Sequence, residues 1–349
     1  MDVSLFDFHL PPDQIAQQPV PERDQARLLV LDRASGRILA HTIVAALPEF
    51  LRRGDLLVVN DTRVFPARLL GRRDPTGGAV ECLLVRRLEA GQWEALMHPG
   101  QKLHPGALVR FEAAGMTLRA EVLARHFHGR RTIRLWSDTG DDVDRIVDAI
   151  GHVPLPPYIH RPDETADRER YQTVFARARG SVAAPTAGLH LTTRLLDRLA
   201  GEGIERVEIT LHVGYGTFKP VRVEQVEDHR VDAEFFEVPE AAARSLETAR
   251  AEARRVVAVG TTTTRALETA GAAGGGRVAA GPATSELFIR PGHRFQVVGG
   301  LLTNFHLPKS SLLMLVCAFA GREPVLEAYR EAVSSGYRFY SYGDAMLIL

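Results

Sequence analysis

The first part of the chain consists of short apolar runs separated by turn residues. Leu28–Asp32 and Arg37–Thr42 flank Arg33-Ala34-Ser35-Gly36, which predicts a β-hairpin. Val44–Arg53 predicts a short helix, and Leu56–Val59 predicts a buried strand. Short β-like runs then recur at a spacing of roughly 8–12 residues, which predicts a small barrel. These runs are Ala67–Gly71, Val80–Arg87, Trp93–Met97, Ala107–Phe111, Leu118–Ala124 and Thr132–Trp136.

Beyond the predicted barrel, helical periodicity alternates with apolar strands. The predicted helices are Asp142–Ile150, Thr192–Ala200, Pro239–Arg254, Thr264–Ala272, Ser310–Ala320 and Pro324–Ser334. The predicted strands are Ile204–Leu211, Arg255–Val259, Glu286–Arg290 and Phe295–Val298. The Pro-rich segment Val153–Pro157 predicts a connection between domains.

Together these elements predict an α/β main domain with an inserted small antiparallel β-barrel domain. The main domain is predicted to be discontinuous, with residues 1–61 plus 152–349, and the barrel domain to span residues 62–151. A chain of 349 residues is long enough for about two domains of this kind.

The amino-acid composition excludes several classes of protein. Hydrophobic residues make up 45% of the chain and charged residues 25%, which excludes a disordered chain, a collagen-like chain and a coiled-coil rod. The longest apolar run, Leu312–Ala320, has only nine residues and cannot span a bilayer. Cys82 and Cys317 are the only cysteines, which excludes a disulfide framework and a thiolate zinc site. With no secretory signal visible at the start, we expect a cytoplasmic protein.

Charge is unevenly distributed although the chain is formally neutral. Residues 62–137 carry 13 Lys and Arg against 6 Asp and Glu, and the remaining residues carry 30 against 37. A basic module on an acidic body predicts a polyanionic partner. Lysine occurs only as Lys102, Lys219 and Lys309. A retained lysine can mark a place that needs a compact or titratable ammonium, although chance explains three such positions equally well.

Five segments at the ends of predicted elements are rich in polar or small residues. In the first, Asn60-Asp61-Thr62-Arg63 follows a buried strand, and the carboxyl ends of such strands bind ligands in α/β sheets. An Asx-turn that caps the strand is the alternative. The second, Gly180–His190, has side chains small enough to let backbone N–H groups approach a ligand. An ordinary helix entry capped by Thr192 is the alternative there.

The other three segments contain imidazole, ammonium, amide or hydroxyl groups. Leu211–Pro220 places His212 at a strand end before a Gly-x-Gly turn, which is a weak signal because the dinucleotide fingerprint is incomplete. A satisfied core histidine is the alternative for His212, and Lys219 seven residues later favours a functional role. Val256–Arg265 is a strand followed by a helix start crowded with threonines, which favours an anion but lacks the Walker pattern. Competition of these threonines for the N-cap is the alternative. Leu301–Ser311 combines an amide, an imidazole, an ammonium and hydroxyls, and is best explained as a site.

Taken in order, these segments closely resemble one family, the S-adenosylmethionine:tRNA ribosyltransferase-isomerases of queuosine biosynthesis. The resemblance also includes Ile15-Ala16-Gln17-Gln18-Pro19 near the start and Tyr337–Met346 near the end. It therefore covers nearly the whole chain. Tyr340 stands where the resemblance leads us to expect Phe, and Ser310-Ser311 where Ser-Thr is commoner.

The resemblance implies an α/β domain carrying an inserted barrel, in agreement with the pattern. It implies an enzyme that moves the ribosyl part of S-adenosylmethionine onto 7-aminomethyl-7-deazaguanine at the tRNA wobble position. The implied products are epoxyqueuosine-tRNA, adenine and methionine. S-adenosylmethionine is then a substrate, no separate cofactor is expected, and tRNA carrying the modified base is the partner.

Candidate residues follow from the five segments and the closing string. Proton transfer is assigned as a hypothesis to the imidazole and ammonium groups His212, Lys219, His306 and Lys309. The candidate substrate-binding residues are Asn60, Asp61, Arg63, Thr186, His190, Gly214, Gly216, Thr261, Thr262, Thr263, Arg265, Asn304, Arg338 and Asp344. No metal ligands are predicted, because the histidine pairs lack further partners at ligand spacing.

Two other functions are compatible with parts of this sequence. A class I methyltransferase also uses S-adenosylmethionine, but its strand and Gly-x-Gly loop near the domain start are absent. A non-catalytic RNA-binding protein would leave the polar cluster at 303–311 unexplained. A monomer with no membrane contact is favoured.

Overall fold

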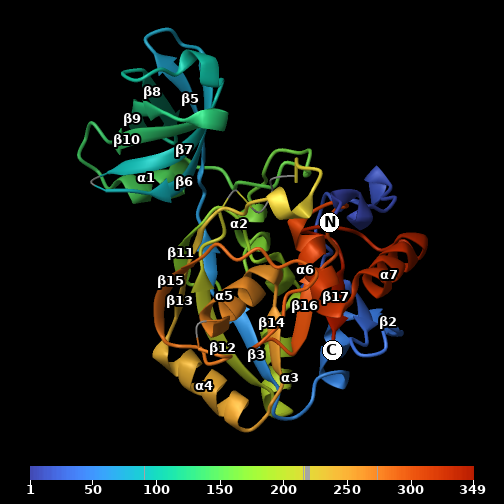
Figure 1. The fold of residues 1–349 in the computed structure, drawn as a ribbon. Coiled ribbons are helices and arrows are strands. Elements are labelled where there is room, and N and C mark those ends of the chain that lie inside the picture. Colours follow the sequence, from blue (N-terminus) through green and yellow to red (C-terminus); the bar gives the residue numbers. More distant parts are fainter. Residues whose placement is uncertain (90, 215, 217–220, 273) are drawn as a thin grey trace.

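The computed structural model describes residues 1–89, 91–214, 216, 221–272 and 274–349 (Figure 1). Within these residues, nine strands form one mixed sheet. Their order is β15 (Gly281–Ser285), β13 (Glu234–Val238), β12 (Glu205–Leu211), β3 (Leu56–Asn60), β14 (Val256–Val259), β16 (Gly300–Asn304), β17 (Ala345–Ile348), β1 (Arg27–Leu31) and β2 (Ile38–Ile43). The central strands β12, β3, β14 and β16 are parallel, and β17 runs antiparallel to β16.

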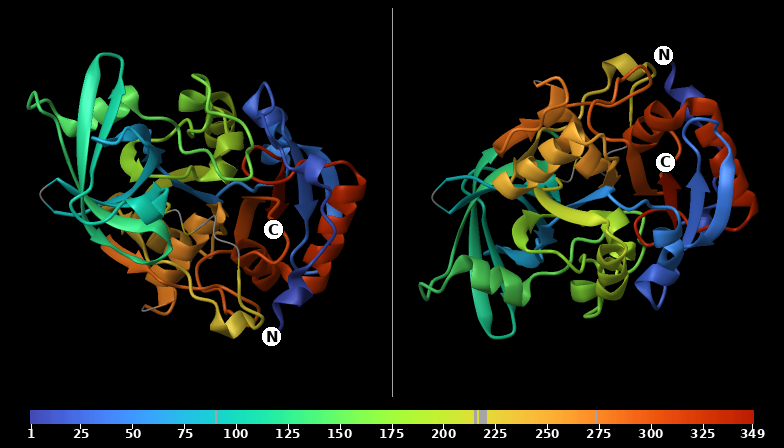
Figure 2. Two further views of the ribbon diagram at one scale, coloured as in Figure 1. Left: turned by 90° about the horizontal axis from the view of Figure 1, so that it is seen from above. Right: turned by 90° about the horizontal axis from the view of Figure 1, so that it is seen from below.

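Both faces of the sheet are covered (Figure 2). One face packs against α4 (Glu240–Ala251), α5 (Thr261–Ala272), α6 (Ser311–Ala320) and α7 (Arg322–Ser334). The other face packs against α3 (Thr193–Gly201) and the 3₁₀ segments η4 (Val44–Glu49) and η7 (Thr186–His190). In β3, Leu56 and Val58 enter the first core whereas Leu57 and Val59 enter the second. A strand buried on both faces reads as a continuous apolar run, which is why 56–59 was recognisable.

The predicted barrel is present as a separate lobe (Figure 1). Among the described residues, six antiparallel strands close in the order β10-β7-β6-β5-β8-β9. In chain order they are β5 (Arg68–Asp74), β6 (Ala79–Arg87), β7 (Gln92–His98), β8 (Leu108–Ala113), β9 (Met116–Arg125) and β10 (Arg130–Trp136). The apolar face of α1 (Val143–Ile150) joins the barrel core through Ile146, Val147 and Ile150. Closure removes the sheet edges that an open six-stranded sheet would expose.

The barrel is inserted between two parts of the α/β body. The chain leaves β3 through β4 (Thr62–Val64) and returns through α2 (Asp167–Arg170) and β11 (Ala178–Ser181), which pairs in parallel with β4. The fold is therefore an α/β domain with an inserted antiparallel barrel. The boundaries at 61/62 and 151/152 stay predictions.

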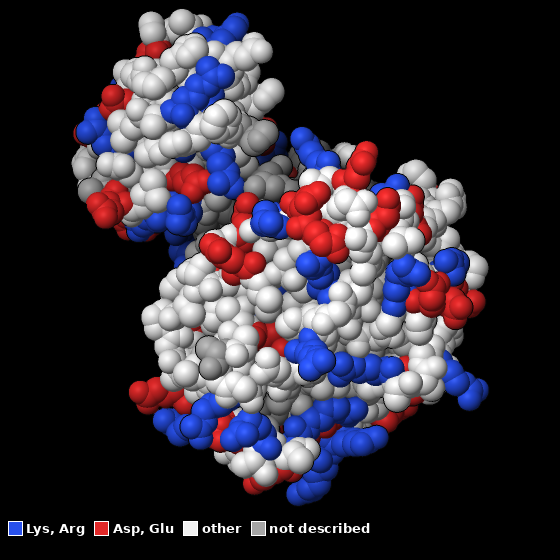
Figure 3. Space-filling view, in the orientation of Figure 1, with Lys and Arg blue, Asp and Glu red and all other residues white. Residues whose placement is uncertain are grey.

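Charged side chains connect the two lobes. Arg130 of β10 lies 3.0 Å from Asp232 of the body, and Arg179 of β11 lies 2.9 Å from Asp148 of α1. On the face shown in Figure 3, basic side chains of the barrel lie along its border with the body, where acidic side chains gather. No helix among the described residues is long and apolar enough to cross a membrane.

Some predicted elements are wrong. Glu286–Arg290 and Phe295–Val298 are not strands, and the neighbouring strands are β15 and β16. The buried Glu268 carboxylate of α5 accepts the backbone N–H groups of Gln296, Val297 and Val298, so a side chain replaces a strand partner there.

The segment predicted as the helix Val44–Arg53 is also different in the structure, where it forms the shorter 3₁₀ helix η4 with Pro48 inside it. Proline lacks the N–H that an α-helix would use at this position. The other predicted helices and strands are present with ends shifted by a few residues.

Candidate active site

Four strand ends meet at one edge of the sheet. Because β12, β3, β14 and β16 are parallel, their carboxyl ends lie together. The residues that follow them are His212, Asp61, Gly260 and Phe305. The oppositely directed β17 begins at the same edge, directly after Asp344. Ligands bind at this edge in open α/β sheets, particularly where the strand order changes direction.

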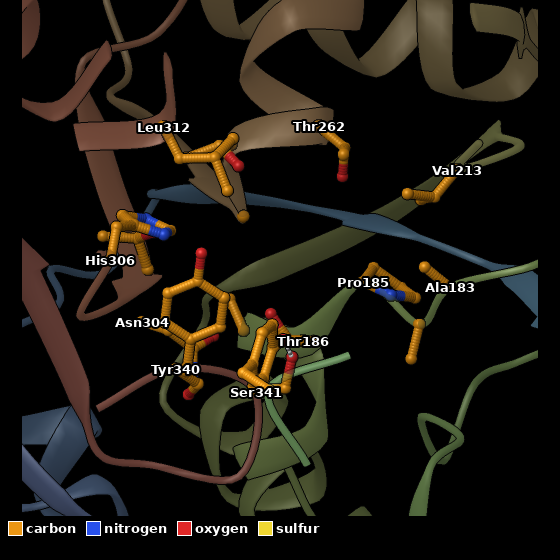
Figure 4. A pocket seen from close by; sticks show the side chains of 16 residues that line it. Ala183, Pro185, Thr186, Val213, Thr262, Asn304, His306, Leu312, Tyr340 and Ser341 are labelled. Atoms are coloured by element: carbon orange, nitrogen blue, oxygen red, sulfur yellow. Dashed lines mark hydrogen bonds between the residues drawn. The ribbon is translucent and has the colours of Figure 1, made fainter. Parts of the chain in front are cut away.

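A pocket opens at this edge (Figure 4). Its empty space, including the open mouth, is about 540 Å³. Its walls are small, aromatic or hydroxylic residues with an amide and an imidazole. They are Tyr158, Ala183, Ala184, Pro185, Thr186, Ala187, Val213, Gly260, Thr261, Thr262, Thr303, Asn304, His306, Leu312, Tyr340 and Ser341.

Asn304 connects three segments at the pocket wall. Its Nδ2 donates to His190 Nε2 at 3.0 Å and to the Tyr340 carbonyl at 3.1 Å. Its Oδ1 is buried and has no hydrogen-bond partner among the described residues. Burial, with Arg338 and Arg23 nearby, lowers the pKa of His190 to about 4, so this ring is neutral and accepts from the amide. A buried acceptor without a donor indicates a place for a ligand or a water.

His306 lines the pocket from the segment after β16. Its ring Nε2 lies 2.9 Å from Thr303 Oγ1, and its backbone N–H donates to the Tyr329 hydroxyl. The Nδ1 atom makes no hydrogen bond to any residue that the structure describes. Burial lowers the pKa of His306 to about 3, so the imidazole is neutral at pH 7.

The threonines at the start of α5 divide into two groups. Thr261 and Thr262 line the pocket at the helix N-terminus, where the dipole favours negative charge. Thr263 Oγ1 donates to the Val259 carbonyl and Thr264 Oγ1 to the Gly260 carbonyl. The predicted binding residue Thr263 is therefore placed inside the helix packing. Thr186, also predicted, lines the pocket from η7.

His212 lies beside the pocket, because Val213 is the residue of this segment that faces it. The His212 Nδ1 is 2.8 Å from Thr62 Oγ1, and the ring stacks on Phe235. Burial lowers the pKa of His212, and the nearby Asp61 and Glu237 oppose that change. A side chain at Gly180 would come within 2.6 Å of the ring, which explains the glycine there.

The residues after β3 secure the sheet edge. Asn60 Oδ1 accepts the backbone N–H groups of Thr62 and Leu211, and its Nδ2 donates to the Leu211 carbonyl. Asp61 accepts from Thr210 Oγ1 at 2.6 Å and from Arg177 Nη2 at 2.9 Å. Arg63 is exposed and lines a separate groove between the lobes.

Other candidates lie around the pocket or away from it. Arg265 and Gly216 line a second pocket that adjoins the first, and the Gly214 N–H donates to Glu234 at its wall. Lys309 Nζ pairs with Asp7 at 2.6 Å on the surface, and both side chains are half exposed. Lys219 lies outside the described residues.

The two charged candidates of the closing segment organise its backbone. The Asp344 carboxylate accepts the backbone N–H groups of Arg27 and Arg338, and burial raises its pKa. Arg338 donates to the carbonyls of Gln18 and Tyr342.

Sequence reasoning missed the aromatic part of the site. Tyr340 has a φ of +75° and packs its ring edge-on to Tyr158, with 3.9 Å between ring centroids. The Tyr158 hydroxyl hydrogen-bonds to Ser341. A left-handed conformation at a non-glycine residue is unfavourable and tends to persist at functional sites. The closing string Tyr337–Met346 contains Tyr340 and was the available signal, but only its charged residues Arg338 and Asp344 were predicted to bind.

Fold and site together define an α/β protein with a ligand pocket at the carboxyl edge of its central strands and an inserted barrel. No group of three or more potential metal ligands is present within the described residues. The family model for a queuosine biosynthesis protein matches residues 3–348. The chain belongs to this family, that of the S-adenosylmethionine:tRNA ribosyltransferase-isomerases.

Full-length relatives agree with this assignment. Proteins of Heliobacterium modesticaldum (50% identical) and Symbiobacterium thermophilum (51% identical) match over 349 residues and 100% of each chain. Both are named S-adenosylmethionine:tRNA ribosyltransferase-isomerase. A crystal structure of an S-adenosylmethionine tRNA ribosyltransferase from Thermotoga maritima is 39% identical, with a TM-score of 0.55, and the match covers 99% of this chain and 100% of that one.

Proposed function

We propose that this protein transfers and isomerises the ribosyl part of S-adenosylmethionine onto 7-aminomethyl-7-deazaguanine at the tRNA wobble position. The products are epoxyqueuosine-tRNA, adenine and methionine. Membership of the family supports the reaction class, and no separate cofactor takes part in the proposal. The observation that carries it is the pocket at the sheet edge, where a neutral imidazole faces a space walled by apolar and aromatic groups.

The chemistry needs a base that is unprotonated at neutral pH. The positive sulfur of S-adenosylmethionine acidifies the neighbouring ribose 5′ C–H, and His306 Nδ1 accepts that proton. The electron pair of the broken C–H bond forms a C4′=C5′ double bond as the C4′–O4′ bond breaks. The O4′ electron pair forms an aldehyde at C1′ as the C1′–N9 bond breaks, and adenine leaves with the proton that His306 accepted. The amine of the tRNA base then adds to C4′ and loses a proton, and the electron pair that moves to C5′ attacks C1′, which closes a five-membered carbocycle. The resulting C1′ oxyanion displaces methionine from C5′ as the epoxide forms. Thr303 orients the ring through its contact to Nε2.

The barrel supplies the contact to tRNA in this proposal. Residues 62–137 carry 13 Lys and Arg but only 6 Asp and Glu, so pairing within the barrel leaves an excess of positive charge. Arg131 does not contribute to the positive charge at the surface, because it is buried and donates to backbone carbonyls. Contacts between arginine and phosphate make affinity fall steeply with salt.

Mass spectrometry of a reaction with S-adenosylmethionine and tRNA bearing the aminomethyl base tests the proposal. We expect adenine, methionine and an epoxyqueuosine nucleoside together. The variant His306→Asn should lower turnover about 10²- to 10⁴-fold while S-adenosylmethionine still binds. His41→Asn on β2 is the matched control. A methylated nucleoside would support a methyltransferase instead, and tRNA binding without consumption of S-adenosylmethionine would support an RNA-binding protein.

A further inference from the structure

The second pocket adjoins the first and is not used by the chemistry above. The two share Thr262 and Leu312, which form one wall in Figure 4. Its empty space, including the mouth, is about 470 Å³. Whereas the first pocket is walled by apolar, aromatic and hydroxylic groups, the second contains Asp232, Glu234 and Arg265. A ligand that extends across Thr262 would therefore meet uncharged apolar, aromatic and hydroxylic groups at one end and charges of both signs at the other.

Arg265 has a donor that the protein does not use. The side chain is 10% exposed. Its Nη1 donates to Glu234 Oε2 at 2.5 Å, and its Nε donates to the Leu287 carbonyl at 3.1 Å. Its Nη2 is buried and has no hydrogen-bond partner among the residues described. A buried guanidinium N–H without an acceptor is costly, so this atom indicates an acceptor that arrives with a ligand. A carboxylate suits the planar guanidinium best.

Two carboxylates of the protein also line this pocket, one of them the ion-pair partner of Arg265. Glu234 is buried and also accepts the Gly214 N–H at 3.1 Å. Asp232 Oδ2 accepts from Arg130 at 3.0 Å. The backbone at Gly216 approaches so closely that a Cβ there would lie 2.6 Å from Asp232 Oδ2. Glu234 and Asp232 are each paired with an arginine, so the pocket presents charges of both signs. An α-amino acid likewise carries both charges on one carbon.

We infer that the second pocket binds the α-amino acid end of S-adenosylmethionine, with the carboxylate on Arg265 Nη2 and the ammonium toward Glu234 and Asp232. This inference rests on the proposed function. The adenine then occupies the first pocket beside Tyr158 and Tyr340, since flat heterocycles pack well on aromatic rings. The sulfonium lies between these two ends, on the side of the first pocket where His306 is placed (Figure 4).

A ligand series measured by calorimetry tests the assignment. The probes are S-adenosylhomocysteine, its decarboxylated analogue and 5′-methylthioadenosine, which lacks the amino acid. We expect the wild-type protein to bind the decarboxylated analogue about 10- to 100-fold more weakly than S-adenosylhomocysteine, the size of a lost charged hydrogen bond. Arg265→Lys should weaken S-adenosylhomocysteine by a similar factor and leave 5′-methylthioadenosine unchanged. The exposed Arg277→Lys, in an ion pair with Glu247, is the matched control.

Two results would overturn the inference while leaving the proposed function intact. One is equal wild-type affinity for S-adenosylhomocysteine and its decarboxylated analogue in an enzyme that still releases adenine. The other is an equal loss for all three probes in Arg265→Lys, which indicates a structural role. If Arg265→Lys does not fold, the wild-type affinities for S-adenosylhomocysteine and its decarboxylated analogue alone test the inference. No binding of any probe and no release of adenine by the wild type would overturn the proposed function together with this inference.

Discussion

Two buried arginines, one in the barrel and one at the sheet edge, are satisfied to different extents. Arg131 is 1% exposed, and its three side-chain nitrogens donate to the carbonyls of Leu103, Arg130 and Gly100. Arg265 is 8% exposed and leaves Nη2 without a partner among the described residues. In the closed barrel, the buried guanidinium of Arg131 binds the backbone of the loop around Gly100 and Leu103. The sheet edge keeps a donor at Arg265 Nη2 and an acceptor at Asn304 Oδ1 that no described residue satisfies.

The largest expected effect is a loss of stability on replacing Arg131, whose side-chain nitrogens all have acceptors. Arg131→Met removes the donor of three backbone carbonyls, so we expect the free energy of unfolding to fall by about 3–5 kcal/mol. Urea titration followed by circular dichroism measures this. Arg134→Met, which breaks an exposed ion pair with Glu121, is the control and should change stability by less than about 1 kcal/mol. Equal losses for both variants would contradict the structural role assigned to Arg131.

Acidification should act on the sheet edge. The pKa values of His190 and His306 are lowered by burial to about 4 and about 3, below the ordinary value of 6.5. The unfolded chain therefore takes up protons first as the pH falls below about 6.5, and stability decreases down to about pH 4. Each histidine contributes about 2 kcal/mol between pH 7 and pH 5.

Urea titrations of the wild type and His306→Asn at pH 7 and pH 5 isolate this effect. The variant should lose about 2 kcal/mol less stability than the wild type across the interval. His41→Asn controls for removal of a histidine. An identical pH dependence for wild type and His306→Asn would show that the buried ring is not responsible.

The smallest effect concerns the barrel surface. Arg125 is exposed and has no ion pair among the described residues, whereas Arg134 is paired with Glu121 at 2.6 Å. If Arg125 contacts a tRNA phosphate, Arg125→Ala should reduce the slope of log affinity against log salt by about 0.9. Fluorescence anisotropy with labelled tRNA between 50 and 200 mM salt, values chosen to span the steep range, measures the slope. Arg134→Ala should reduce it less, and an unchanged slope in Arg125→Ala would remove Arg125 from the interface.

The sequence by itself determined the barrel strands, most of the helices and the strands β3, β12 and β14, in their order along the chain. The barrel was predicted because alternating apolar residues and Gly- and Pro-containing turns are local signals. The polar segments at strand ends were predicted to form the site, and parallel pairing of β12, β3, β14 and β16 does bring four of them to one edge. Family resemblance then supplied the reaction class, which composition and spacing alone do not contain.

Only the tertiary structure decided which of those polar groups face the pocket. Val213 faces it and His212 does not, Thr262 lines it while Thr263 bonds inside its helix, and Tyr340 enters it from a distant segment. The wrong strand Phe295–Val298 has the same origin, because Glu268 satisfies the backbone of 296–298 from another element. Apolar periodicity depends only on residues that are close in sequence. The partner of a buried amide, such as Asn304 with His190, is chosen by packing between segments far apart in sequence, and no local pattern encodes that choice.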